Sequence, residues 1–117
     1  MPLAEFNQLV GEAKSQIKEI GPAELKGMLD AGEDFALIDV READEQAKGM
    51  IAGAVGLARG ILERDIDRVT TDKQRKIVLY CAGGARSALA ALSLKQMGFK
   101  DVLSLSGGYG GWKATGY

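Results

Sequence analysis

Short apolar runs alternate along the chain with segments whose apolar residues have helical spacing. The runs lie at residues 17–20, 35–40, 51–57, 77–80 and 102–105. Runs of this length predict strands, and the continuous ones predict strands that are buried on both faces. The helical segments between and after them lie at 23–29, 42–48, 61–69, 86–97 and 112–114. This alternation predicts an α/β fold: a mostly parallel sheet of about five strands, flanked by helices on both faces.

A further helix is predicted ahead of the first strand. Its apolar positions follow helical spacing and are Leu3, Phe6, Leu9, Val10 and Ala13. We interpret residues 1–16 as a helical extension of a single domain that spans residues 1–117. The apolar face of this helix needs a surface to pack on. Either its own domain or a second copy of the chain can supply it, and we favour a homodimer through residues 3–16.

Composition and charge exclude several classes of function. The 117 residues are 46% hydrophobic and 26% charged, as in ordinary globular domains. With 15 basic and 16 acidic residues, the net charge is −1, which gives no reason to expect nucleic acid or a membrane as partner. The chain has one cysteine and no histidine. We therefore expect no internal disulfide and no zinc or haem site.

The N-terminal segment resembles neither a signal peptide nor a membrane anchor. It lacks a basic region followed by an apolar stretch, and no apolar run approaches the length of a membrane span. The expected location is cytoplasmic, unless an export signal has been removed from the sequence.

The single cysteine lies where chemistry is expected. Cys81 follows the apolar run 77–80 directly, and the carboxyl ends of parallel strands are where such folds place their sites. The six residues that follow it are Ala82, Gly83, Gly84, Ala85, Arg86 and Ser87. The small residues expose backbone N–H groups just where a helix begins, and such groups stabilise an anion. This setting predicts a reactive thiolate rather than an inert buried cysteine.

Local charge supports the same interpretation. Residues 73–100 carry six cationic side chains and no acidic one, whereas residues 24–45 carry eight acidic side chains. Positive charge near Cys81 favours a thiolate and an anionic substrate. We therefore expect the pKa of Cys81 to lie well below the unperturbed value of about 8.5. The helix N-terminus, the loop N–H groups and Arg86 would lower this pKa, and burial would oppose them.

Three motifs resemble those of the rhodanese family of sulfurtransferases. They are the loop CAGGAR at 81–86, the stretch LIDVRE at 37–42 and the stretch GGYGGW at 107–112. The resemblance implies double displacement, a mechanism that requires no metal, no cofactor and no general base. The Cys81 thiolate takes the outer sulfur of an anionic donor such as thiosulfate or polysulfide, and the Cys81 persulfide passes it to cyanide or a thiol. It also implies that residues 82–87 bind the substrate, and that Arg86 braces the loop or binds the donor.

Three more charged residues are candidates for supporting roles. Asp39 ends a buried strand, where an unpaired carboxylate is costly, so we expect it to pair with Arg41, Arg59 or a loop N–H. Arg59 either joins that network or faces the substrate. Many members of the family that the chain resembles carry His at the position before Ile51, where this chain has Met50. The difference removes a possible polar contact but no catalytic group.

Three alternative functions stay open. A thiol phosphatase or arsenate reductase also uses a Cys–loop–Arg anion site, but its loop has one residue more than the four between Cys81 and Arg86. A regulatory rhodanese-like module typically lacks the cysteine. A persulfide carrier that serves a protein partner would keep it.

Overall fold

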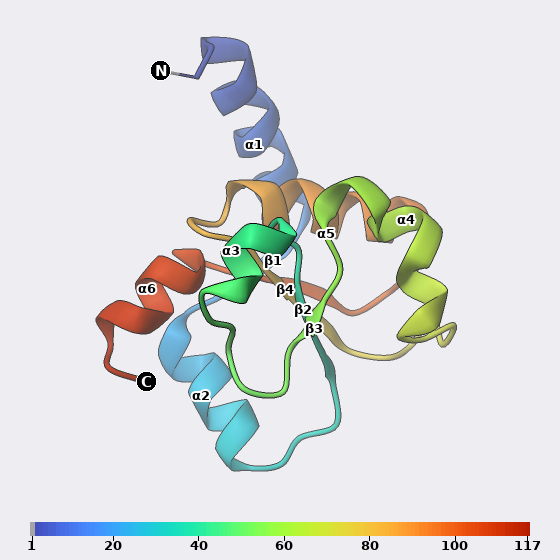
Figure 1. The fold of residues 1–117 in the computed structure, drawn as a ribbon. Helices are drawn as coiled ribbons and strands as arrows, with labels where there is room; N and C mark the ends of the chain where they lie inside the picture. The colour runs from blue at the N-terminus through green and yellow to red at the C-terminus, as the bar shows by residue number, and fades with distance from the viewer. Residues whose placement is uncertain (1) are drawn as a thin grey trace.

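The structure, a computed structural model, describes residues 2–117 and contains a five-stranded parallel sheet. The strand order is β1-β5-β4-β2-β3, so β4 lies at the centre. Figure 1 shows the elements, which are α1 (Ala4–Gln16), β1 (Lys18–Ile20), α2 (Pro22–Asp30), β2 (Ala36–Asp39), α3 (Ala43–Ala47), β3 (Val55–Gly56), η1 (Arg59–Ile61), α4 (Leu62–Asp65), η2 (Ile66–Arg68), β4 (Ile77–Tyr80), α5 (Ala85–Gln96), β5 (Val102–Leu105) and α6 (Gly108–Ala114).

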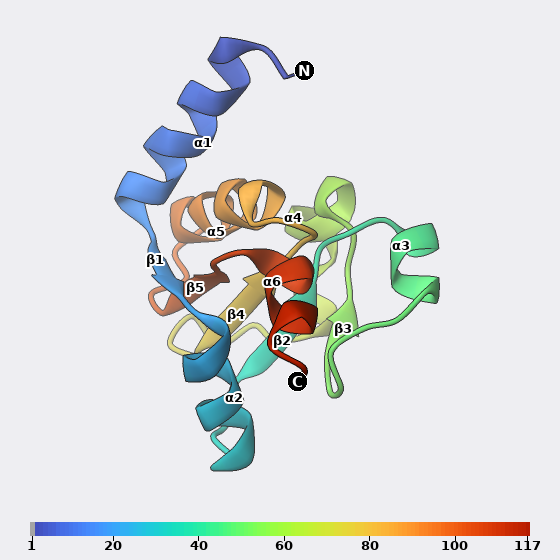
Figure 2. The same ribbon diagram turned by 90° about the vertical axis from the view of Figure 1, so that its left-hand side faces the viewer.

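Alternating side chains of the central strands fill two separate cores. Ile77 and Leu79 of β4 pack with α4 and α5 on one face, while Val78 and Tyr80 pack with α2 and α6 on the other. Figure 2 shows α4 and α5 together on one side of the sheet and α2 on the opposite side. Because side chains of a strand point alternately to the two faces, both faces need apolar cover. The predicted α/β architecture with helices on both faces is confirmed.

Three local predictions were wrong. The strand expected at 51–57 is reduced to Val55–Gly56, because Ile51 turns into the core and its N–H donates to the Tyr80 hydroxyl at 3.0 Å. The helix expected at 61–69 is divided into three short helical pieces. The helical segment expected at 112–114 begins earlier, since α6 starts at Gly108.

Helix α1 extends away from the rest of the domain in both views (Figures 1 and 2). Val10 and Ala13 are its buried residues, and α1 packs against α5. Leu3 and Leu9 remain 72% and 57% exposed. The predicted helix is therefore present, and part of its apolar stripe lies open to solvent within the single chain.

Candidate active site

The Cys81 loop connects the central strand to the N-terminus of α5. Strand β4 ends at Tyr80, and α5 begins at Ala85 after Gly84, whose φ of 108° lies in the left-handed region. Glycine adopts this conformation without strain, so the chain can reverse within a few residues. The turn brings the first amides of α5 back over the thiol. The loop is therefore shaped by Gly84 and by the short distance between strand and helix.

The sulfur of Cys81 accepts hydrogen bonds from the loop and from the first turn of α5. The N–H of Gly84 lies 3.1 Å from Sγ and the N–H of Ser87 lies 3.3 Å from it. The Ser87 hydroxyl is 3.5 Å from Sγ. No side chain of the preceding residue caps α5, so Sγ occupies the place of a capping oxygen and satisfies an amide that has no partner within the helix.

These contacts decide the charge state of the thiol. Burial raises the pKa of Cys81, which is only 1% exposed. The hydrogen bonds from the Ser87 hydroxyl and from the amides of Ser87, Gly84 and Gly83 lower it by more. The net pKa therefore lies below its ordinary value. The direction agrees with the sequence-based prediction, while the Ser87 hydroxyl is a contributor that the prediction did not include.

Helix α6 holds the loop from the other side. The N–H of Tyr109 donates to the Cys81 carbonyl at 2.7 Å, and the N–H of Gly110 donates to the Ala82 carbonyl at 3.0 Å. Gly108, with φ of 57°, lies so close that an added Cβ would be 2.5 Å from the Cys81 oxygen. Gly108 therefore packs directly against the active-site loop, and the first turn of α6 orients that loop.

The side chain of Arg86 links α5 to α3 rather than pointing freely into the loop. Its two terminal nitrogens lie 2.8 and 2.9 Å from the two carboxylate oxygens of Glu45, on α3. This bidentate pair lowers the pKa of Glu45 to about 2. Most of the positive charge of Arg86 is therefore balanced by Glu45, a partner that sequence reasoning did not identify because the two residues are 41 positions apart.

The other charged candidates form two separate networks. Asp39 accepts from the backbone and side chain of Arg41, and an Arg41 nitrogen lies 2.7 Å from its carboxylate. Arg41 also donates to the Gly49 carbonyl at 2.6 Å. The Asp39–Arg41 pairing was expected. Arg59 does not join it, since its partner in the described structure is Glu63, at 2.7 Å.

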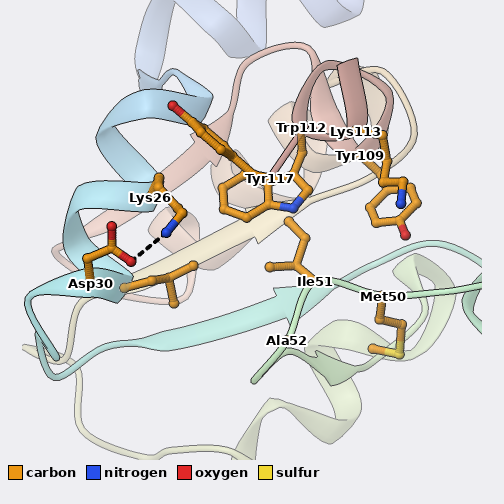
Figure 3. Close-up of a pocket in the computed structure, with 10 residues that line it drawn as sticks. Lys26, Asp30, Met50, Ile51, Ala52, Tyr109, Trp112, Lys113 and Tyr117 are labelled. Carbon is orange, nitrogen blue, oxygen red and sulfur yellow. Dashed lines mark hydrogen bonds and ion pairs between the residues drawn. The ribbon is translucent and has the colours of Figure 1, made fainter. Parts of the chain in front are cut away.

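A cavity of about 410 Å³ lies on the α2–α6 side of the sheet (Figure 3). Tyr109 and Trp112 of α6 line it, together with Lys26 of α2, which pairs with Asp30. None of the residues 81–87 lines it. The cavity is therefore separate from the thiol, although Tyr109 belongs to both regions through its backbone and its side chain.

Within residues 2–117, no helix is both long and apolar enough to span a lipid bilayer. In the same range, no group of three or more Cys, His, Asp or Glu side chains is arranged to hold a metal ion.

The comparisons with known proteins agree with this geometry. The model of the rhodanese-like domain matches residues 21–115. The chain belongs to the rhodanese-like family. It is 40% identical over 98 residues to a Bacillus subtilis protein named "Putative sulfurtransferase YtwF", with 84% of this chain and 92% of that protein covered. The thiosulfate sulfurtransferase GlpE of Coxiella burnetii is 36% identical over 81 residues, which cover 69% and 74% of the two chains.

Solved structures of related proteins share the fold. A rhodanese-related protein from Thermoplasma volcanium has a TM-score of 0.74 at 29% identity, with 86% of this chain and 94% of that one covered. A Rhodopseudomonas palustris protein, RPA3614, has a TM-score of 0.86 at 34% identity, with 99% and 96% covered. RPA3614 is described as a possible tyrosine phosphatase. This rhodanese-like chain is thus related to sulfurtransferases and resembles one protein to which another activity has been attributed.

Proposed function

We propose that this protein is a sulfurtransferase that moves the outer sulfur of thiosulfate or a polysulfide to cyanide or a thiol. The thiolate of Cys81 attacks the outer sulfur of thiosulfate, the S–S bond of the donor breaks, and sulfite leaves with the bonding electrons. A Cys81 persulfide results. Cyanide or a thiol then attacks the outer sulfur of the persulfide, which releases the Cys81 thiolate again. Neither half of the cycle needs a metal or a general base.

The observation that carries this proposal is the set of donors around Sγ. The amides of Gly84 and Ser87 donate to it at 3.1 and 3.3 Å, and the Ser87 hydroxyl lies 3.5 Å away, where it can turn its hydrogen to a thiolate. The two amides are already in position, so they stabilise negative charge on sulfur without having to reorganise during the reaction. They support the thiolate before attack, and the same loop supports the anionic persulfide after it. The relationship to sulfurtransferases is consistent with this use.

The test compares sulfur transfer by the unchanged protein and by Cys81→Ser. We expect steady formation of thiocyanate from thiosulfate or polysulfide and cyanide in the first, and none above background in the second. Ser15→Ala is the matched control, since Ser15 lies on the exposed side of α1. Retained turnover in Cys81→Ser would overturn the proposal. Uptake of sulfur without turnover would instead favour the persulfide carrier.

A phosphatase is the second candidate, because of the likeness to RPA3614. The loop argues against it, since four residues between Cys81 and Arg86 make a small ring. In addition, the Arg86 guanidinium is held by Glu45 rather than directed at an oxyanion. We expect no useful hydrolysis of aryl phosphates between pH 5 and 8. Hydrolysis that exceeds sulfur transfer, and that Cys81→Ser abolishes, would make the phosphatase the better assignment.

A further inference from the structure

Strand β5 carries a buried hydroxyl among apolar side chains. Ser104 is fully buried, and its neighbours in the strand are the apolar residues Val102, Leu103 and Leu105. Leu103 and Leu105 belong to the core on the α2 side, and Val102 belongs to the core on the α5 side. Strand alternation therefore directs Ser104 toward α5. A polar side chain at such a position is costly unless it is hydrogen-bonded, so its partner is informative.

That partner is Ser87, whose hydroxyl oxygen lies 2.8 Å from the Ser104 hydroxyl oxygen. Within residues 2–117, this is the one hydrogen bond found for the Ser104 side chain. Ser87 has two further contacts, with the Gly84 carbonyl at 3.3 Å and with the Cys81 sulfur at 3.5 Å. The three side chains thus form a chain from β5 to the thiol.

The choice of partners fixes the direction of these hydrogen bonds. If Ser87 donated to Ser104, the Ser104 hydrogen would be left buried without an acceptor, which costs free energy. Ser104 therefore donates to Ser87. The hydrogen of Ser87 then has two acceptors within reach, the Gly84 carbonyl and the Cys81 sulfur. In the thiol form, S–H can donate to Ser87 and the Ser87 hydrogen goes to Gly84. In the thiolate form, the Ser87 hydrogen turns to the sulfur.

We infer that Ser104 is a positioning residue for Cys81: by donating to Ser87, it leaves the Ser87 hydrogen free to follow the charge on the sulfur. The inference rests on the proposed thiolate role of Cys81 and deepens it. A hydroxyl that accepts one hydrogen bond also becomes a better donor. Ser104 therefore strengthens the contact between Ser87 and the thiolate without touching the sulfur itself.

Other charges on the surrounding elements do not replace this contact. Among them are Arg86 on α5, Glu45 on α3, Asp39 at the end of β2 with Arg41 just after it, and Tyr109 on α6. Arg86 is paired with Glu45, Asp39 is paired with Arg41, and the Tyr109 ring lies 4.3 Å from the Arg41 guanidinium carbon. Strand β5 carries no charged side chain. Within the described structure, Ser104 is thus the contribution of β5 to the polarity around Cys81.

The test is the pH dependence of Cys81 alkylation by iodoacetamide, which does not require sulfur transfer. We expect Ser104→Ala to move the midpoint to higher pH and to slow alkylation about threefold below the midpoint, and Ser87→Ala to slow it about tenfold. In the Ser87→Ala background, Ser104→Ala should produce no further change. Ser93→Ala is the control, because Ser93 lies on the same helix but bonds to Glu63.

A matched pair of variants separates the hydroxyl from packing. Ser104→Thr and Ser104→Val have nearly the same shape, and only the first keeps the hydroxyl, so the threonine variant should retain a lower midpoint than the valine variant. An unchanged midpoint in Ser104→Ala, or an equal shift with and without Ser87, would overturn the inference. A wild-type midpoint at or above the unperturbed value of about 8.5 would instead overturn the thiolate role on which it rests.

Discussion

Replacement of Gly108 by Ala should lower the stability of the protein and distort the active-site loop. The residue has φ of 57°, and an added Cβ would lie 2.5 Å from the Cys81 oxygen and 2.7 Å from the Ala82 carbonyl carbon. Because both contacts are backbone atoms of the loop, no side chain can rotate away to relieve them. Either α6 or the loop has to move.

The expected loss in the free energy of unfolding has two contributions. A left-handed conformation costs a residue with a Cβ about 1–2 kcal/mol. Displacement of α6 would weaken the two hydrogen bonds that its first turn donates to Cys81 and Ala82, and each is worth about 0.5–1.5 kcal/mol. We therefore expect Gly108→Ala to lower the free energy of unfolding by about 2–5 kcal/mol and to reduce sulfur transfer in the fraction that remains folded.

Gly32→Ala is the matched control. Gly32 has φ of 65°, and an added Cβ would meet nothing within 4 Å. It should therefore lose only the conformational contribution of about 1–2 kcal/mol and keep full activity. Urea unfolding gives the two free energies, and the thiosulfate–cyanide assay gives the activities. If the two variants lost equal stability and both stayed fully active, α6 would not orient the active-site loop.

Three further predictions concern the thiol, Arg86 and α1. The lowered pKa of Cys81 stabilises the folded state at pH above the unfolded pKa, and this contribution is lost as the pH falls through the folded pKa. The rates of alkylation and sulfur transfer should decline over the same acidic range. Rates that rise only above pH of about 8.5 would contradict the lowered pKa. Arg86→Ala should raise the pH midpoint of alkylation less than Ser87→Ala does, because Glu45 balances the Arg86 charge. Lys95→Ala, at the far end of α5, should leave the midpoint unchanged. A larger effect of Arg86→Ala than of Ser87→Ala would show that Glu45 does not balance the Arg86 charge. We propose that residues 3–16 form a homodimer through the exposed side chains of Leu3 and Leu9, so Leu9→Glu should dissociate the dimer in sedimentation, and a wild-type monomer at high concentration would refute the proposal.

The sequence was sufficient to predict the features that depend on local pattern. The apolar runs at 35–40, 77–80 and 102–105 lie over β2, β4 and β5, because strands buried on both faces leave a continuous hydrophobic signal. The position of Cys81 followed from β4 and from the general location of sites in parallel sheets. The Asp39–Arg41 pair was predictable because the two residues are adjacent along the chain and an unpaired buried carboxylate is costly.

Features that depend on distant partners could not be predicted in this way. Four glycines between 107 and 111 indicate a loop, yet α6 forms there, and its first amides bond to carbonyls of residues 81 and 82. Ser104 was indistinguishable from any strand serine until its partner Ser87, 17 positions away, was known. The apolar segment at 51–57 resembled a strand, but Ile51 lies outside β3, and its N–H bonds to the side chain of Tyr80, 29 positions away, instead of to a neighbouring strand.

The most direct test of the proposed function is the intact mass of the protein after treatment with thiosulfate or polysulfide, with excess donor removed before measurement. Cys81 is the only cysteine in the chain, so a persulfide must form there or not at all. We predict a gain of one sulfur atom, its loss on addition of cyanide, and no gain in Cys81→Ser. An unchanged mass in the wild-type protein under both donors, or an equal gain in Cys81→Ser, would contradict the proposed sulfur transfer through Cys81.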